Sequence, residues 1–223
     1  MADNDAQKTE DKKRLSFQGT SIVSCGTLRM ELKQLQEEGF LDADKIFFTT
    51  PGLHEVCSEL KEQVIRQVKR ALEVSEKIIV VYGSLCYVDP VDMSGLDKLL
   101  ESFGKNVLRI RAQNCVDSLA GREEREKIAA GRKVFWLTPG WMRFKDLVFK
   151  DWDIGKINEN FPKNDVAIVL DAIGYYDKIM EEDPMKILEY SDWMHLGVEA
   201  YHVTLDRLKG LLLDKLKVLK GNE

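Results

Sequence analysis

The stretch KIIVVYGSLC, residues 77–86, is the clearest signal of fold in this chain. After the opening lysine, its apolar residues run on without interruption and are mostly β-branched, which is typical of a strand buried on both faces. Gly83 follows at once, as in the tight turns that join a strand to the next helix. The stretch therefore predicts one strand of a parallel sheet, with Cys86 just beyond its carboxyl end.

Six further apolar runs have the same character. Amphipathic patterns separate many of them, and the clearest repeats every four residues from Val56 to Leu72. This alternation predicts right-handed βαβ units, and so an α/β fold with an open, mostly parallel, Rossmann-like sheet and helices on both faces. The six runs are residues 21–24, 45–48, 107–111, 134–137, 166–170 and 199–203.

The polar start of the chain and the length of the remainder set the domain organisation. We expect residues 1–16 to be a disordered tail and residues 17–223 to form a single α/β domain. The irregular segment 141–164 carries several aromatic residues among charges. It is either a lid or oligomer contact, or a helical crossover with its aromatics in the core, and the usual burial of aromatic side chains favours the crossover.

Composition excludes several classes of protein. Among the 223 residues, 44% are hydrophobic and 32% charged, and the net charge is −5, which argues against a nucleic-acid partner. We find neither a membrane-spanning run nor the apolar core of a signal peptide, so we expect a cytoplasmic protein. In that compartment four cysteines are not a disulfide framework, which leaves metal binding, redox chemistry or burial.

Three of the cysteines follow predicted strands. Cys25 closes the first strand, Cys86 follows the third, and Cys115 comes after the fourth, while His54 follows the second. Because parallel sheets bind ligands beyond the carboxyl ends of their strands, we expect these side chains to meet at one edge. Three thiolates with an imidazole suit zinc, and three thiolates with an open corner suit an iron–sulfur cluster. Cys57 has the spacing of a core residue of its helix instead.

Other residues near these strand ends have two interpretations. Gly26 and Gly83 open turns that either cradle an anion with backbone amides or let two backbone segments pass closely. Arg29 and Arg111 either bind a substrate carboxylate or phosphate, or form ion pairs with Glu31 and Asp117. Without a metal, Cys25 could act alone as a nucleophile, since it precedes a helix whose amino end favours a thiolate.

Five segments stand out in order along the chain: CGTLRMEL, TPGLH, YGSLC, RAQNCVDSLAGREER and FWLTPGW. Together they resemble the DUF1638 family of methanogenic archaea and anaerobic bacteria. The resemblance runs from about residue 21 to residue 177. Where the family has a His-Asp pair before the third cysteine, this chain has Gln113-Asn114, which moves a ligand role to His54, Gln113 or solvent.

The resemblance implies a place in one-carbon metabolism, because members often lie beside genes of corrinoid-dependent methyltransferases. It implies a corrinoid protein or methyltransferase as partner, and corrinoid as a second cofactor candidate beside zinc or an iron–sulfur cluster. A homo-oligomer would use segment 141–164 as its contact.

Three functions follow from these observations. The first is a metal-binding enzyme or accessory factor in methyl, thiol or corrinoid chemistry. The second is a non-enzymatic carrier of metal or corrinoid that docks to a methyltransferase, and the third is a metal-free thiol enzyme that uses Cys25. The metal ligands would be Cys25, Cys86, Cys115 and His54; the catalytic groups Cys25, His54 and Arg111; and the cofactor-binding residues Gly26, Gly83, Gln113 and Asn114.

Overall fold

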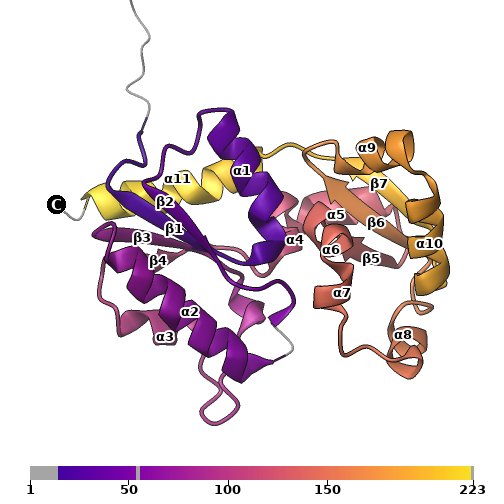
Figure 1. Ribbon diagram of the computed structural model, residues 1–223, viewed down its shortest axis with the longest axis horizontal. Helices are drawn as coiled ribbons and strands as arrows, with labels where there is room; N and C mark the ends of the chain where they lie inside the picture. Colours follow the sequence, from indigo (N-terminus) through magenta and orange to yellow (C-terminus); the bar gives the residue numbers. More distant parts are fainter. Residues whose placement is uncertain (1–14, 54–55, 222–223) are drawn as a thin grey trace, which may run out of the picture.

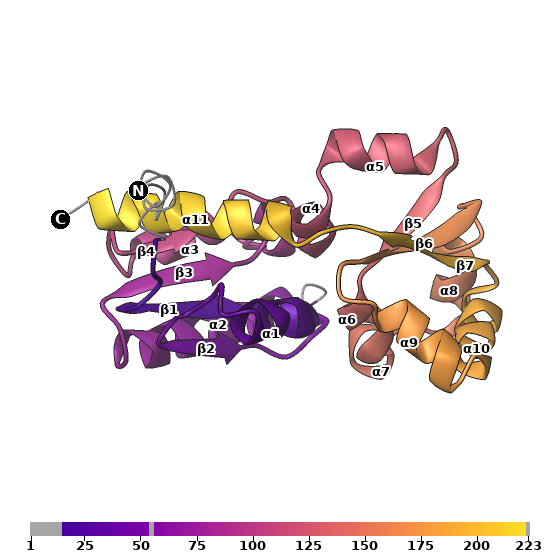
Figure 2. The same ribbon diagram turned by 90° about the horizontal axis from the view of Figure 1, so that it is seen from above.

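The computed structural model describes residues 15–53 and 56–221. Residues 1–14 of the expected tail and the candidate ligand His54 therefore lie outside the described residues. The described chain forms two parallel sheets that lie side by side, each with its own helices (Figures 1 and 2). We call the two parts the first half, built on β1 to β4, and the second half, built on β5 to β7.

The first half holds a four-stranded sheet in the order β2-β1-β3-β4, with every pair parallel. Side chains alternate between its faces, as the pleat requires. Ile22, Ile79 and Val81 pack toward α1 and α11, whereas Val23 and Val80 pack toward α2 and α3. Its elements are β1 (Thr20–Ser24), η1 (Gly26–Leu28), α1 (Arg29–Glu37), β2 (Lys45–Phe48), α2 (Cys57–Leu72), β3 (Lys77–Val81), η3 (Ser84–Cys86), α3 (Leu96–Glu101), β4 (Val107–Arg109) and α4 (Cys115–Leu119).

The second half holds a three-stranded parallel sheet in the order β5-β6-β7. The last helix, α11, then returns and lies along the first half (Figure 2). One continuous cluster of buried apolar side chains runs from β1 and β3 through α11 to β6, and so joins the halves. The elements are α5 (Arg122–Ala129), β5 (Val134–Leu137), α6 (Pro139–Arg143), α7 (Lys145–Val148), α8 (Ile154–Asn160), β6 (Val166–Asp171), α9 (Tyr175–Glu182), α10 (Met185–Met194), β7 (Val198–His202) and α11 (Asp206–Gly221).

The parallel α/β architecture predicted from the sequence is confirmed, and all seven predicted runs form strands. The expectation of a single sheet is wrong, because β5 pairs with β6 and not with β4. The strand β4 has only three residues, and α4 and α5 separate it from β5, so the chain leaves the first sheet before the next strand begins. At the end of β4 the Arg109 guanidinium donates to the carbonyls of Tyr82, Ile110 and Ala112.

Segment 141–164 contains most of α6 and all of α7 and α8, and it leads from β5 to β6. Phe149 and Phe161 are buried, and Trp141 and Trp152 are partly buried against the same cluster. Phe161 stacks on Trp152, with ring centroids 5.3 Å apart, and meets Phe135 edge-on. The segment is thus arranged as the helical crossover. No helix in the described ranges is long and apolar enough to cross a membrane.

Candidate functional site

A cavity of about 400 Å³ lies between the two halves. The first half contributes the carboxyl ends of β1, β3 and β4, and the second half contributes β5, α5 and α6. Apolar side chains make up much of its wall, and polar groups come from both halves. The lining residues are Cys25, Thr27, Leu28, Leu53, Val81, Tyr82, Gly83, Leu85, Cys86, Asn114, Cys115, Val116, Ser118, Arg125, Phe135, Trp136 and Trp141.

The three cysteines singled out from the sequence all line this cavity. Cys25 directly follows β1, Cys86 ends η3 after β3, and Cys115 begins α4 after β4. These three strands are neighbours in the sheet, so their carboxyl ends lie at one edge. Strand order reverses between β1 and β3, the place where open α/β sheets bind their ligands.

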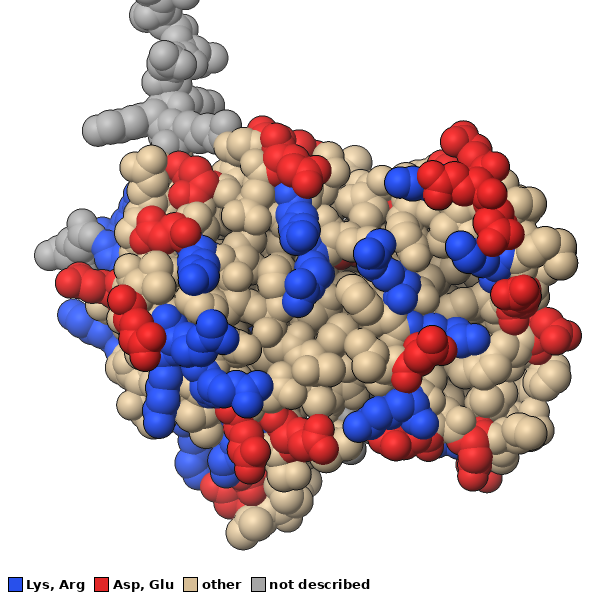
Figure 3. Space-filling view, viewed as in Figure 1, with Lys and Arg blue, Asp and Glu red and all other residues tan. Residues whose placement is uncertain are grey.

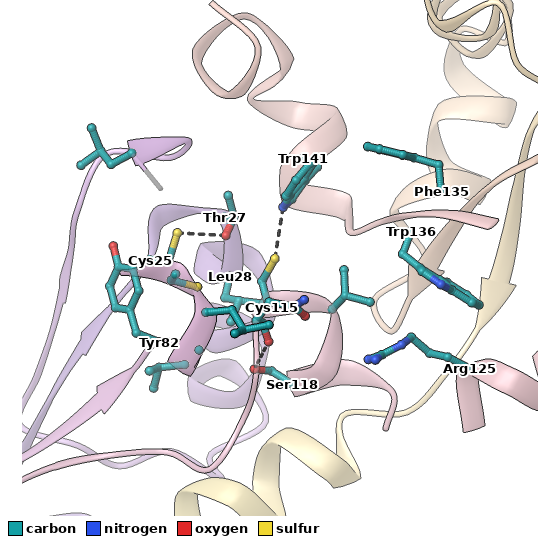
Figure 4. Close-up of a pocket in the computed structure, with 17 residues that line it drawn as sticks. Cys25, Thr27, Leu28, Tyr82, Cys115, Ser118, Arg125, Phe135, Trp136 and Trp141 are labelled. Carbon is teal, nitrogen blue, oxygen red and sulfur yellow. Dashed lines mark hydrogen bonds between the residues drawn. The ribbon is translucent and has the colours of Figure 1, made fainter. Parts of the chain in front are cut away.

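Two of the sulfurs accept hydrogen bonds (Figure 4). The Thr27 hydroxyl donates to Cys25 Sγ at 3.1 Å, within the first half. The indole Nε1–H of Trp141 donates to Cys115 Sγ, also at 3.1 Å, across the boundary between the halves. Trp141 is held in place by Thr138, whose side chain caps the amino end of α6. Each half therefore supplies a donor to a sulfur in the cavity.

Burial sets the protonation of the thiols. Burial raises the pKa of Cys25, and it raises the pKa of Cys86 to about 11, with a further contribution from Cys25. Burial also raises the pKa of Cys115 strongly, and the nearby Cys86 and Cys25 add to this effect. All three are therefore neutral thiols near pH 7 in the protein without a bound cation.

Buried ionic contacts fix the helix that begins with Cys115. The Asn114 side chain caps α4 by accepting from the Asp117 amide at 2.8 Å, and Asp117 accepts from the Gln113 amide at 2.9 Å. Arg207, at the start of α11, donates to the Asp117 carboxylate at 3.1 Å. Gln113 and Asn114 thus support the turn before Cys115. Of this pair only Asn114 also lines the cavity.

The two glycines serve close approach of backbone segments. A Cβ on Gly26 would lie 2.5 Å from the carbonyl oxygen of Thr49, and one on Gly83 would lie 2.1 Å from that of Gln113. Both distances are too short for any side chain, which explains glycine at these positions. Gly83 also lines the cavity, while Gly26 does not.

The structure does not bring every predicted residue to the cavity. Arg111 is exposed and is not a lining residue. Its alternative role, an ion pair with Asp117, is not formed either, because Asp117 pairs with Arg125 and Arg207. Cys57, predicted to be a core residue of its helix, packs beside the α2 core and outside the cavity. Arg29 lies over the Phe48 ring rather than pairing with Glu31.

Sequence reasoning missed Arg125 and Thr27 as parts of the site. Arg125 is one of several charged residues on a short helix, and nothing in that pattern separates it from its neighbours. Thr27 lies two residues after Cys25 in a turn, and a hydroxyl at that spacing can reach back to the sulfur. The spacing of Thr27 from Cys25 could therefore have been recognised in the sequence.

The arrangement of the thiols bears on which metal they fit. Within the described part of the chain, no group of three or more His, Cys, Asp or Glu side chains is placed to hold a single metal ion. A tetrahedral zinc site needs thiolate sulfurs within about 4 Å of one another. The three thiols line one cavity without forming such a group.

Fold and cavity together define an α/β protein with a thiol-lined pocket between two parallel sheets. The chain belongs to the DUF1638 family, described as proteins of unknown function, whose model matches residues 48–212. Cys86 and Cys115 lie inside the matched region and Cys25 precedes it. Neither the curated proteins nor the solved structures include a significant match to this chain.

Proposed function

We propose that Cys25, Cys86 and Cys115 bind an iron–sulfur cluster in the cavity between the halves. One observation carries this proposal: three thiols, from the ends of three neighbouring strands, line one cavity of about 400 Å³. Cysteine ligands of a cluster bind different irons, so their sulfurs surround the cluster rather than meeting at a point.

The polar contacts of the sulfurs support the proposal. Hydrogen bonds to cysteine sulfur and exclusion of solvent tune the reduction potential of such clusters. Here Thr27 and Trp141 each donate to a candidate ligand, and apolar side chains form much of the surrounding wall. Each thiol gives up its proton on binding iron, and the metal charge then stabilises the buried thiolate.

Three cysteines leave one iron of a four-iron cluster without a cysteine ligand. Asn114, Ser118 and Arg125 are the polar groups that the cavity offers nearby to a small ligand. A bound cluster would supply electrons or a Lewis-acidic iron to that ligand. We extend the proposal to an enzyme or accessory factor in the methyl, thiol or corrinoid chemistry of one-carbon metabolism. The non-enzymatic alternative is a carrier of metal or corrinoid that docks to a partner methyltransferase.

A metal-free thiol enzyme is the weaker candidate. A nucleophilic cysteine needs a lowered pKa, and burial raises the pKa of the Cys25 thiol. The Thr27 hydrogen bond works against this effect but is the smaller influence. No cationic side chain donates to Cys25 among the described residues, whereas an activated cysteine has such a neighbour.

The test is reconstitution of the full chain without oxygen, using ferrous iron and sulfide. Iron and acid-labile sulfide are then quantified, and absorption and electron paramagnetic resonance spectra are recorded. We expect each of the variants Cys25→Ser, Cys86→Ser and Cys115→Ser to lose most of the bound iron. Cys57→Ser is the matched control, since Cys57 lies outside the cavity and its loss affects only packing.

Two outcomes contradict the proposal. One is stoichiometric zinc, without iron or sulfide, in protein purified without oxygen. The other is equal loss of iron in Cys57→Ser, which would indicate adventitious binding by thiols. Assays of the loaded protein with methylated donors then separate an enzyme from a carrier, because only the enzyme turns over without a partner.

A further inference from the structure

A second concave surface lies on the other side of the loop that follows β2. It is a groove of about 550 Å³ that reaches from the first half to α6 and α7 of the second. Four cationic side chains line it: Arg29 and Lys33 from α1, Arg66 from α2 and Arg143 from α6. Figure 3 shows Lys and Arg side chains gathered over α1 and α2 on this face.

None of these four cations has an anionic partner in the part of the chain that the structure describes. Other cations of the described chain do form ion pairs, as in Lys61 with Asp89 and Lys98 with Asp92. Among the residues that the structure describes, no acidic side chain lines the groove. The whole chain has 38 acidic and 33 basic residues, so this concentration of positive charge is local and runs against the overall balance. Uncompensated cations around one hollow attract an anion.

Two of the guanidinium groups lie on aromatic rings. Arg29 lies over the Phe48 ring, 4.4 Å from its centroid, and Arg143 lies over Phe144 at 5.9 Å. Both rings are lining residues of the groove. Stacking limits the freedom of an arginine side chain while leaving the edge of its guanidinium to donate hydrogen bonds. These two donors are therefore partly fixed before any ligand arrives.

Hydrogen bonds also fix the bottom of the groove. Gln63 on α2 accepts a hydrogen bond from the Thr50 amide at 2.9 Å and donates to the Thr50 hydroxyl at 3.1 Å. Gln67, one turn further, donates to the carbonyl of Phe48 at 3.1 Å. These bonds tie the loop after β2 to α2, and so hold Arg66 beside that loop. The cations thus surround a stable surface.

We propose that this groove binds a small organic ligand that carries two or more phosphate groups. Guanidinium groups bind phosphate oxygens in pairs, and four positive charges from both halves match a ligand with several negative charges. Phe48, Phe144 and Leu147 offer apolar surface for its organic part. The groove and the thiol cavity are neighbours: Thr49 lines the groove and hydrogen-bonds Tyr82, which lines the cavity.

The test uses inorganic pyrophosphate as the probe and calorimetric titration of the full chain. The double variant Arg66→Gln/Arg143→Gln removes one cation from each half. We expect it to bind pyrophosphate at least tenfold more weakly than the native chain, and affinity of the native chain should fall as salt rises. Circular dichroism melting of each variant checks that the fold is kept, since both side chains are exposed.

The matched control is Lys69→Gln/Lys163→Gln, which removes two exposed cations, again one from each half, outside the groove. It should bind within twofold of the native chain. Equal weakening in the control, or no binding to the native chain, overturns the proposal. Tighter binding of citrate than of pyrophosphate also overturns it, because the groove would then select carboxylates. Cys86→Ser should bind pyrophosphate normally, which separates this proposal from the cluster.

Discussion

The two halves share the same architecture, but the residues at the carboxyl edges of their sheets make different contacts. In the second half, the polar residues at that edge bond to nearby backbone: Thr138 caps α6, and Asp171 accepts from the amides of Ile173 and Tyr176. In the first half, the residues beyond the strands are thiols that face the cavity. In the described residues, therefore, the first edge places its thiols against a cavity, whereas these two side chains of the second edge bond to backbone.

The difference teaches where chemistry and support are placed. The first half supplies the three candidate ligands, and the second supplies an aromatic cluster and the Trp141 donor. A buried acid shows the same contrast, because Asp171 has its backbone donors, whereas neither carboxyl oxygen of Glu31 has a hydrogen-bond partner among the described residues. Three predictions test this division of roles.

The largest effect is expected from Phe161→Ala in the second half. Phe161 is fully buried and touches four other aromatic rings, so we expect a loss of about 3–5 kcal/mol in the free energy of unfolding. Urea titration followed by tryptophan fluorescence measures it. All four tryptophans lie in the second half, at positions 136, 141, 152 and 193, so far-ultraviolet circular dichroism is recorded alongside.

Iron loading of Phe161→Ala at low temperature should equal that of the native chain, if the second half only supports the site. The two optical transitions should also coincide, because one apolar cluster joins the halves. Separate transitions would show that the halves unfold independently. Lost iron in a folded variant would show that the second half takes a direct part in binding.

The next largest effect is expected from Glu31→Gln, which should stabilise the folded protein. Burial raises the pKa of Glu31 to about 8, and the negative charge of Asp171 contributes. The folded state therefore keeps a proton that the unfolded state loses near pH 4.5, and native stability falls as pH rises from 4.5 to about 8. The free energy of unfolding of the native chain falls by up to about 1.4 kcal/mol per pH unit over this range. The free energy of unfolding of the variant should therefore exceed it by on the order of 3 kcal/mol at pH 7.

The measurement is the free energy of unfolding of both proteins between pH 4 and pH 9. The difference between them should be small at the acid end and level off above pH 8. A constant difference would mean that Glu31 stays charged when folded. Glu189→Gln, an exposed change on α10, is the control and should show no such trend.

The smallest effect is expected from Trp141→Phe. This change removes the indole donor to Cys115 Sγ and keeps most of the ring, so the stability cost should be about 1 kcal/mol. If the cluster proposal holds, iron content stays the same while the reduction potential falls, because hydrogen bonds to sulfur favour the reduced state. Trp152→Phe changes a ring outside the cavity and should leave the potential unaltered. An unchanged potential in Trp141→Phe would remove the second half from any role in tuning.

The strands could be predicted from the sequence, but their division between two sheets could not. An uninterrupted apolar run such as residues 166–170 indicates that both faces are covered, and it carries no information on which strand lies alongside. In the structure β5 pairs with β6 and not with β4, from which α4 and α5 separate it. That pairing is decided by contacts that form only in the fold.

The residues of the candidate site also fall into two groups, those that the sequence could predict and those that it could not. Cys25, Cys86 and Cys115 could be assigned to one edge because strand ends of a parallel sheet converge. Trp136 and Arg125 could not, since they come from the half whose position was unknown. Asn114 was considered for cofactor binding, although an asparagine three residues before Asp117 is also typical of a helix cap, and it has that structural role here.

The course of α11 has a consequence for how the protein is made. Leu208, Leu212, Leu216 and Leu219 are all fully buried, and they close one face of a sheet whose strands begin at Thr20. A ribosome releases that sheet long before it releases these leucines, so the growing chain leaves an apolar face uncovered throughout the synthesis of the second half. The first half therefore cannot complete its core until about residue 219 has emerged, and in the meantime α1 covers only part of that face of the sheet.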